Sequence, residues 1–161
     1  MIPAGFAYTR ASSLDEALKQ RAAGGGNVKV LAGGQSLIPL MKLRLARPER
    51  LLDIGTLKEL KGVRTLPDGR LGVGALTTYR ELMDSKPIAH YGVLRDALPT
   101  IADVQVRNLG TVGGSIAHAD PASDLPACLL ALHAEIVARS AKGERRIPAR
   151  EFFLGSFQSA L

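Results

Sequence analysis

The segment Leu109–Pro126, which reads LGTVGGSIAHADPASDLP, decides how this chain can fold. It is made largely of small residues, and it contains no aspartate, glutamate, lysine or arginine before Asp120. Gly110, Gly113 and Gly114 permit backbone angles that other residues avoid, and they let a ligand come close to the main chain. Exposed main-chain N–H groups in such a run are typical of a cradle for a phosphate or pyrophosphate.

A second segment of the same character, Ala32–Ser36, reads AGGQS and follows the apolar run Val28–Leu31. The residues SLIPLMKLRLA over 36–46 are predicted to form a short helix whose N-terminus lies beside these glycines. The N-terminus of a helix carries free N–H groups and partial positive charge, which favour an anion there. We therefore expect two glycine-rich turns to face each other across a ligand.

The composition is that of a globular protein and gives little support to a nucleic-acid partner. Of the 161 residues, 46% are hydrophobic and 22% are charged, which suits one domain or one domain with a small added lobe. The net charge is +6, but few aromatic residues accompany the basic ones and no nucleic-acid motif is present. Two denser basic groups suit either a solvated surface or an acidic partner: Lys42, Arg44, Arg47 and Arg50, and Arg139, Lys142, Arg145, Arg146 and Arg150.

Cysteine and histidine are too sparse to suggest a disulfide framework or a metal site. The single cysteine, Cys128, is expected to be a small buried core residue. The three histidines show no metal-ligand spacing.

No apolar run approaches the roughly 20 residues of a membrane span. The opening MIPAGFAYTR lacks the pattern of a signal peptide, so a cytoplasmic protein is the expectation.

Residues 1–55 are predicted to form a small lobe. A strand over 6–9 is followed by a helix that begins after Ser13, with Glu16 completing a capping box, and that ends in three glycines. A strand over 28–31 then completes a β–α–β unit, so the two strands should be parallel with a right-handed crossover. The apolar residues over 51–54 indicate a third strand.

Residues 56–161 are predicted to form a second lobe of different topology, which makes the whole chain an α+β fold. Its expected elements are a hairpin, a helix capped by Thr77 or Thr78, two further helices and a closing antiparallel pair. They lie over 63–66 with 71–75, 78–83, 93–101, 125–132, and 135–139 with 145–147.

Several common motifs are absent from the sequence. It contains no GxGxxG, no GxxxxGK[ST] and no HExxH, which argues against a Rossmann fold, a P-loop and a zinc protease. A triad of Ser115 or Ser123 with His118 and a nearby carboxylate would lack a nucleophile elbow. Asp124 has two compatible interpretations, as the N-cap of the next helix and as the acceptor for a ligand hydroxyl.

Two long motifs resemble one known family. AGGQSLIPLMKLRLARP at Ala32–Pro48 and RNLGTVGGSIAHADPASDLPA at Arg107–Ala127 are similar to the FAD-binding medium subunit of molybdenum hydroxylases, as in carbon monoxide and xanthine dehydrogenases. The segments FAYTRASSLDEAL and LLDIGTLKELKGV also match, so the resemblance covers nearly the whole chain. It implies the two-lobed FAD-binding fold of the vanillyl-alcohol oxidase type, in which FAD lies between the lobes without a Rossmann motif.

The resemblance also implies which residues hold FAD, through main-chain N–H groups and hydroxyls on two walls. Asp124 would bind FAD hydroxyls, Ile101 would make an apolar contact, and proximity adds Ala117, Asp120 and Leu125. The first wall would consist of Ala32, Gly33, Gly34, Gln35, Ser36, Leu37 and Ile38, and the second of Thr111, Val112, Gly113, Gly114 and Ser115.

The implied role is electron transfer without a catalytic acid–base pair. In the family, a large molybdopterin subunit oxidises the substrate, a small subunit carries electrons through [2Fe–2S] clusters, and FAD passes them to an external acceptor. Family members continue into a C-terminal domain that this chain is expected to lack, which would leave an apolar surface open to self-association. Two alternatives are a fragment that keeps only the fold and a self-contained flavin oxidoreductase.

Overall fold

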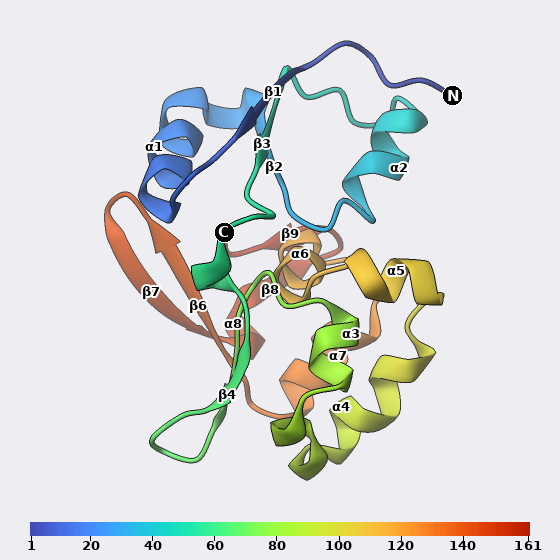
Figure 1. Cartoon of the computed structure of the whole chain (residues 1–161), viewed down its shortest axis with the longest axis vertical. Coiled ribbons are helices and arrows are strands. Elements are labelled where there is room, and N and C mark those ends of the chain that lie inside the picture. The colour runs from blue at the N-terminus through green and yellow to red at the C-terminus, as the bar shows by residue number, and fades with distance from the viewer.

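A three-stranded parallel sheet forms the N-terminal part of the computed structural model, which describes residues 1–161 (Figure 1). β1 (Ala7–Arg10) and β2 (Val28–Leu31) each pair in parallel with β3 (Arg50–Asp53). The three predicted strands are thus confirmed, and the strands of the β–α–β unit do run parallel, but β3 lies between them. β3 suits the central place because Leu51 and Leu52, which point to opposite faces, are both buried.

Helices α1 (Leu14–Gly24) and α2 (Leu37–Lys42) lie on opposite sides of this sheet (Figure 1). The hydroxyl of Ser13 caps α1 by accepting the N–H of Glu16 at 3.2 Å, as predicted. The carboxylate of Glu16 accepts the N–H of Ser12 rather than that of Ser13. The second half of the predicted capping box is therefore wrong by one residue.

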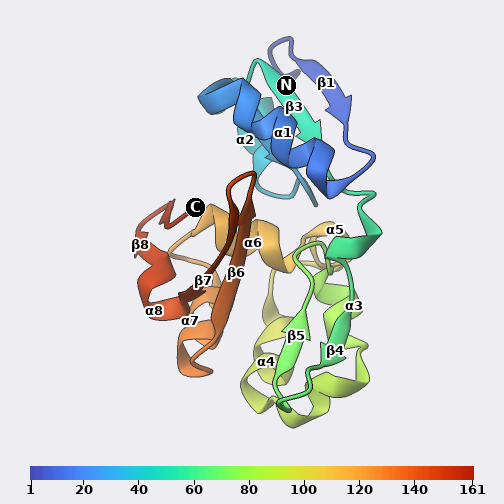
Figure 2. The same ribbon diagram turned by 90° about the vertical axis from the view of Figure 1, so that its left-hand side faces the viewer.

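The middle of the chain consists of one hairpin and several short helices (Figures 1 and 2). β4 (Val63–Thr65) and β5 (Leu71–Val73) form the predicted antiparallel hairpin. The helices of this part are α3 (Tyr79–Met83), α4 (Gly92–Ala97), α5 (Val104–Leu109), α6 (Val112–His118) and α7 (Asp124–Ala131). Along the whole chain, 3₁₀ turns occur at Gly25–Asn27, Lys58–Leu60, Lys86–His90 and Leu98–Thr100. No helix of the molecule is both long and apolar enough to cross a bilayer.

Thr78, not Thr77, caps α3. The hydroxyl of Thr78 accepts the N–H of Glu81, and the side chain of Glu81 accepts the N–H of Thr78, so a complete capping box starts the helix. Thr77 is buried, and its hydroxyl exchanges hydrogen bonds with both main-chain groups of Gly62. Of the two predicted alternatives, the half-buried Thr78 thus caps the helix, and the buried Thr77 ties two loops together.

The glycine-rich segment does not form the open turn expected from the sequence. Thr111 is the N-cap of α6 and accepts the N–H of Gly114 at 3.2 Å, so that Gly113 and Gly114 lie in the first turn of a helix. Glycine disfavours a helix by about 1 kcal/mol relative to alanine. Here the threonine cap and the close packing of Gly113 on Ala75 offset that cost.

The C-terminal part adds a hairpin and a short returning segment (Figure 2). β6 (Glu135–Ser140) and β7 (Gly143–Pro148) form the predicted closing pair. The elements that follow were not predicted: α8 (Ala149–Phe152), β8 (Phe153–Gly155) and β9 (Gln158–Ser159). β9 returns to α6, where Ser159 donates a hydrogen bond to the carbonyl of Ala117.

The apolar side chains form three buried clusters. One lies beneath α1 and the sheet, one among helices α3 to α7, and one around Phe152 beneath the β6–β7 hairpin. Cys128 is a buried member of the helical cluster, as predicted. The lobe boundary after residue 55 stays a prediction, since Leu57 and Leu76 beyond it pack with Leu52 in the first cluster.

Candidate functional site

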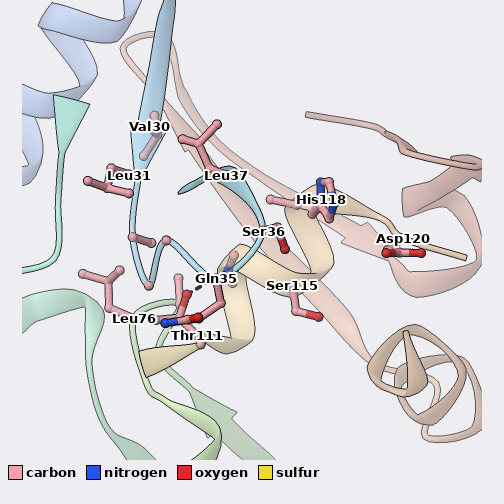
Figure 3. Close-up of a pocket in the computed structure, with 18 of the residues that line it drawn as sticks. Val30, Leu31, Gln35, Ser36, Leu37, Leu76, Thr111, Ser115, His118 and Asp120 are labelled. Carbon is pink, nitrogen blue, oxygen red and sulfur yellow. Dashed lines mark hydrogen bonds between the residues drawn. The ribbon is translucent and has the colours of Figure 1, made fainter. Parts of the chain in front are cut away.

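A cavity of about 650 Å³ lies where the N-terminal sheet meets α6 (Figure 3). Its volume is in the usual range for small-molecule sites, and half of its lining residues are hydrophobic. Two segments define its floor, namely the first glycine segment (Ala32–Ser36) and the second glycine segment (Gly110–Ser115). The two glycine-rich segments thus lie together at one cavity, as predicted.

The first glycine segment offers a row of unused donors. None of the six main-chain N–H groups from Ala32 to Leu37 donates a hydrogen bond to a carbonyl of the chain. The segment follows the end of β2, turns through Gly34 at φ +74°, and leads into α2. Successive N–H groups in such a turn form an anion-binding concavity, which the adjoining helix N-terminus reinforces.

The second glycine segment, in contrast, has its donors occupied. Val112 donates its N–H to the carbonyl of Thr77 at 3.0 Å, and Gly113 donates to that of Ala75 at 2.8 Å. The N–H of Gly114 is satisfied by the hydroxyl of Thr111. The expectation of a second wall built from free main-chain donors is therefore wrong for these three residues. The hydroxyls of Thr111 and Ser115 and the positive end of α6 can still interact with a ligand.

The two segments approach each other through bare main chain. A Cβ atom built on Gly33 would lie 2.1 Å from the carbonyl oxygen of Leu109 and 3.0 Å from the Cα of Gly110. A Cβ atom built on Gly114 would lie 4.0 Å from the Cβ of Ala32. Any side chain at position 33 would push the two parts of the chain apart, so glycine is required there for close approach.

A group of hydroxyls extends the cavity toward α7. The Oγ atoms of Ser115 and Ser123 are 3.2 Å apart, and both residues line the cavity together with Tyr79. Burial raises the pKa of the Tyr79 phenol, and the charge of Asp124 raises it further, so the phenol stays protonated at neutral pH. The hydroxyl of Ser115 pairs with Ser123 and not with His118, which gives the triad hypothesis no support.

The helix α7 starts differently from the sequence-based expectation. Its N-cap is Ser123, and Asp124 is the first helical residue, so the predicted capping role of Asp124 is wrong. A carboxylate in the first turn still interacts favourably with the helix dipole. The other interpretation, that Asp124 accepts a ligand hydroxyl, stays a prediction.

Most of the residues expected to bind a cofactor line this cavity. Ile38, Val112, Asp124 and Leu125 do not line it, and Val112 and Leu125 belong to the buried helical cluster. Those that do are Ala32, Gly33, Gly34, Gln35, Ser36, Leu37, Ile101, Thr111, Gly113, Gly114, Ser115, Ala117 and Asp120.

Sequence reasoning missed several lining residues. Lys29 and Leu31 sit on β2 just before the first glycine segment, and their place at the end of a parallel strand was the available signal. Tyr79 gave no signal in the sequence, because it simply follows a helix cap, and His118 stood out only as a possible member of a serine triad. Figure 3 shows His118 and Asp120 on the side of the cavity away from Leu31 and Leu76.

Comparison with known proteins gives one consistent family. Residues 4–161 match the family model described as the FAD binding domain in molybdopterin dehydrogenase. The glyceraldehyde dehydrogenase medium chain of Sulfolobus acidocaldarius is 48% identical over 158 residues, which are 98% of this chain and 56% of that protein. Subunit alpha of the 6-hydroxypseudooxynicotine dehydrogenase complex of Paenarthrobacter nicotinovorans is 44% identical over 162 residues, which are 100% of this chain and 54% of that subunit.

A solved structure supports the same relationship. Carbon monoxide dehydrogenase from Hydrogenophaga pseudoflava, in a form that lacks the Mo-pyranopterin moiety, superimposes with a TM-score of 0.96 at 42% identity. The match covers 100% of this chain and 56% of that chain. The chain thus spans little more than half the length of the relatives that it matches.

Proposed function

The chain belongs to the family of FAD-binding domains of molybdopterin dehydrogenases, and from this premise we propose which residues hold FAD and what role the chain plays. The relatives are subunits of dehydrogenases, so the family's chemistry is that of oxidoreductase components. The structure carries an α+β fold with a cavity of about 650 Å³ between the glycine-rich segments. That cavity is the proposed FAD site.

The pyrophosphate of FAD is proposed to bind the first glycine segment. The free N–H groups from Ala32 to Leu37 would donate to its oxygens, and they supply what an anion needs in a partly buried place. Gly34 makes this geometry possible, since its φ of +74° is one that side-chain-bearing residues rarely adopt. This row of unused donors is the observation that carries the proposal.

The second glycine segment would contact the cofactor through hydroxyls. Thr111 accepts the N–H of Gly114, which leaves its own hydroxyl hydrogen free to donate. Ser115 and Asp124 are proposed to bind the sugar-alcohol hydroxyls of FAD. A carboxylate can accept hydrogen bonds from hydroxyls, whereas the anionic pyrophosphate would repel it. Val112 and Leu125 are proposed to support these groups from the core.

The proposed role is that of an electron-transfer subunit. When bound, FAD supplies a two-electron carrier, which would take electrons from the [2Fe–2S] clusters of a partner and deliver them to an external acceptor. The partners would be a small [2Fe–2S] subunit and a large molybdopterin subunit, in keeping with relatives that are themselves chains of multi-subunit enzymes. The chain's own task is to bind and orient the cofactor, and the cytoplasm is the proposed location.

The test is FAD affinity in a pair of glycine variants. Gly34→Ala places a Cβ atom on a left-handed backbone and 2.7 Å from Ile38 Cδ1, so it should distort the donor row and lower FAD affinity by about tenfold or more. Gly69→Ala is the matched control, since its φ is +83° and its Cβ atom would meet nothing within 4 Å. Both variants should be measured by calorimetric titration and by thermal unfolding.

The two variants carry similar backbone strain, but only Gly34→Ala adds a close contact, with the flexible Ile38 side chain, and only Gly34 lines the cavity. A comparable loss of FAD affinity in both variants would contradict the proposed site. A wild-type chain that binds no FAD would contradict the proposed function as a whole. Copurification of the native protein with molybdopterin and [2Fe–2S] subunits would separate the electron-transfer role from that of a self-contained flavin oxidoreductase.

A further inference from the structure

An aromatic pair lies at the outer end of the cavity. The rings of His118 and Phe157 are 5.1 Å apart between centroids and are tilted by 55°. His118 lines the cavity at the C-terminal end of α6, whereas Phe157 belongs to the turn between β8 and β9 and is 58% exposed. A phenyl ring with that much exposed surface contributes little to the core.

The backbone at this pair is held in an unfavourable conformation. Phe157 has φ +56° and Ala119 has φ +50°, both in the left-handed region that bulky residues seldom occupy. The N–H of Phe157 donates to the carbonyl of Ala119 at 2.8 Å, and β9 is further tied to α6 by Ser159. Strain of this kind persists where the surroundings impose it, and it is often found at functional sites.

From this geometry we infer that His118 and Phe157 form an aromatic wall for the flavin ring of FAD. The inference rests on the proposed function, because the pyrophosphate must first bind the first glycine segment. The first glycine segment meets α6 at Gly114, where an added Cβ atom would lie 4.0 Å from the Cβ of Ala32, and His118 lies one helical turn farther along α6. That turn is a rise of about 6 Å, which is comparable with the reach of the ribityl chain between pyrophosphate and flavin. The redox-active ring must also be accessible to other molecules, and this end of the cavity carries the exposed aromatic surface.

Aromatic rings attract a planar heteroaromatic ring through offset or edge-to-face contacts. The ring of His118 faces the cavity and the ring of Phe157 supports it from outside, so the pair can act as one surface. The turn that carries Phe157 is fixed to α6 by main-chain hydrogen bonding, which keeps the ring in place before the ligand arrives. Pre-ordering of this kind lowers the entropic cost of binding.

The experiment compares FAD with ADP, which keeps the adenine and the pyrophosphate but lacks the flavin ring. Phe157→Ala should weaken FAD binding about tenfold and leave ADP binding unchanged. Phe157→Gly removes the same ring and relieves the left-handed backbone, so the same loss with an unchanged or higher Tm would exclude misfolding as its cause. Leu154→Ala is the matched control, since Leu154 is 64% exposed and lies on the same hairpin.

A second readout uses the absence of tryptophan from the chain. In Phe157→Trp, an indole separated from the flavin only by the His118 ring should quench the fluorescence of bound FAD more strongly than the indole of Leu154→Trp does. Equal losses of FAD and ADP affinity, or FAD binding that is indifferent to Phe157, would overturn the aromatic wall while the proposed function stands. A wild-type chain that binds neither FAD nor ADP would overturn the proposed function itself, and this inference with it.

Discussion

The two glycine segments look alike in sequence and do opposite things with their main chain. From Ala32 to Leu37, the N–H groups find no carbonyl partner, and all six residues line the cavity. From Val112 to Gly114, every N–H group is satisfied within the protein. A glycine-rich run therefore does not by itself indicate a ligand cradle. Whether such a run can bind an anion depends on whether neighbouring segments already accept the hydrogen bonds of its N–H groups.

The same contrast assigns different reasons to different glycines. Gly34 is needed for its positive φ, Gly33 for the close approach of two main chains, and Gly113 for packing on Ala75. Gly114 faces the exposed side of α6, and a Cβ atom there would meet only Thr111 Oγ1 and Ala32. Substitutions at these positions should therefore separate loss of stability from loss of FAD binding.

The largest effect is expected at the contact between the two segments. Gly33→Ala sets a Cβ atom 2.1 Å from the Leu109 carbonyl, where main chain must move, and should lower the free energy of unfolding by about 3 kcal/mol. Gly26→Ala is the control, since its Cβ atom would meet nothing within 4 Å. Urea titrations of both variants measure the difference. A Gly33→Ala protein as stable as the control would show that the segments are not in main-chain contact.

A smaller contrast is expected within α6. Gly113→Ala would place a Cβ atom 2.7 Å from the carbonyl oxygen of Ala75 and should cost about 2 kcal/mol of stability. A valine there should disturb the fold as well as any cofactor binding. Gly114→Ala should cost less than about 1 kcal/mol, because the Thr111 hydroxyl can rotate away, and should mainly reduce FAD affinity.

Calorimetric titration with FAD and thermal unfolding of the two α6 variants test this contrast. If both variants lose the same stability and the same affinity, the distinction between a packing glycine and a cavity glycine fails.

The smallest effect is expected at two threonine caps. Thr111→Ala and Thr78→Ala each remove a helix N-cap and should each cost about 1 kcal/mol of stability. Only Thr111 lines the cavity, so only its loss should weaken FAD binding, by about fivefold for one lost hydrogen bond. Thr111→Ser should restore most of both properties. Weaker FAD binding in Thr78→Ala would argue that helix stability, and not the hydroxyl, governs affinity.

Local patterns were sufficient to predict most elements. Alternating apolar residues and turn signals located both hairpins, and the cap at Ser13 was predictable from side-chain chemistry alone. The order of the parallel strands was not predictable in this way. It depends on which strand is buried on both faces, and that is settled by the packing of α1 and α2 around the sheet.

The site was predictable as a meeting of two segments but not in its hydrogen bonding. The acceptors for the second segment come from Ala75 and Thr77, far away in sequence, so no local pattern could reveal that its donors are occupied. The aromatic pair was also invisible, because His118 and Phe157 come together only when β9 folds back onto α6.

The meeting of Gly33 with Leu109 has a consequence for how such a site can diversify. Where backbone touches backbone, the spacing is set by covalent geometry and van der Waals radii, so as long as residue 33 is glycine no exchange of neighbouring side chains can widen or narrow the cavity at that point. Variation in the shape of the cavity is thereby confined to its flanks, at positions such as Lys29, Tyr79 and His118. The main-chain contact thus keeps one dimension of the cavity constant while the rest of its lining can change.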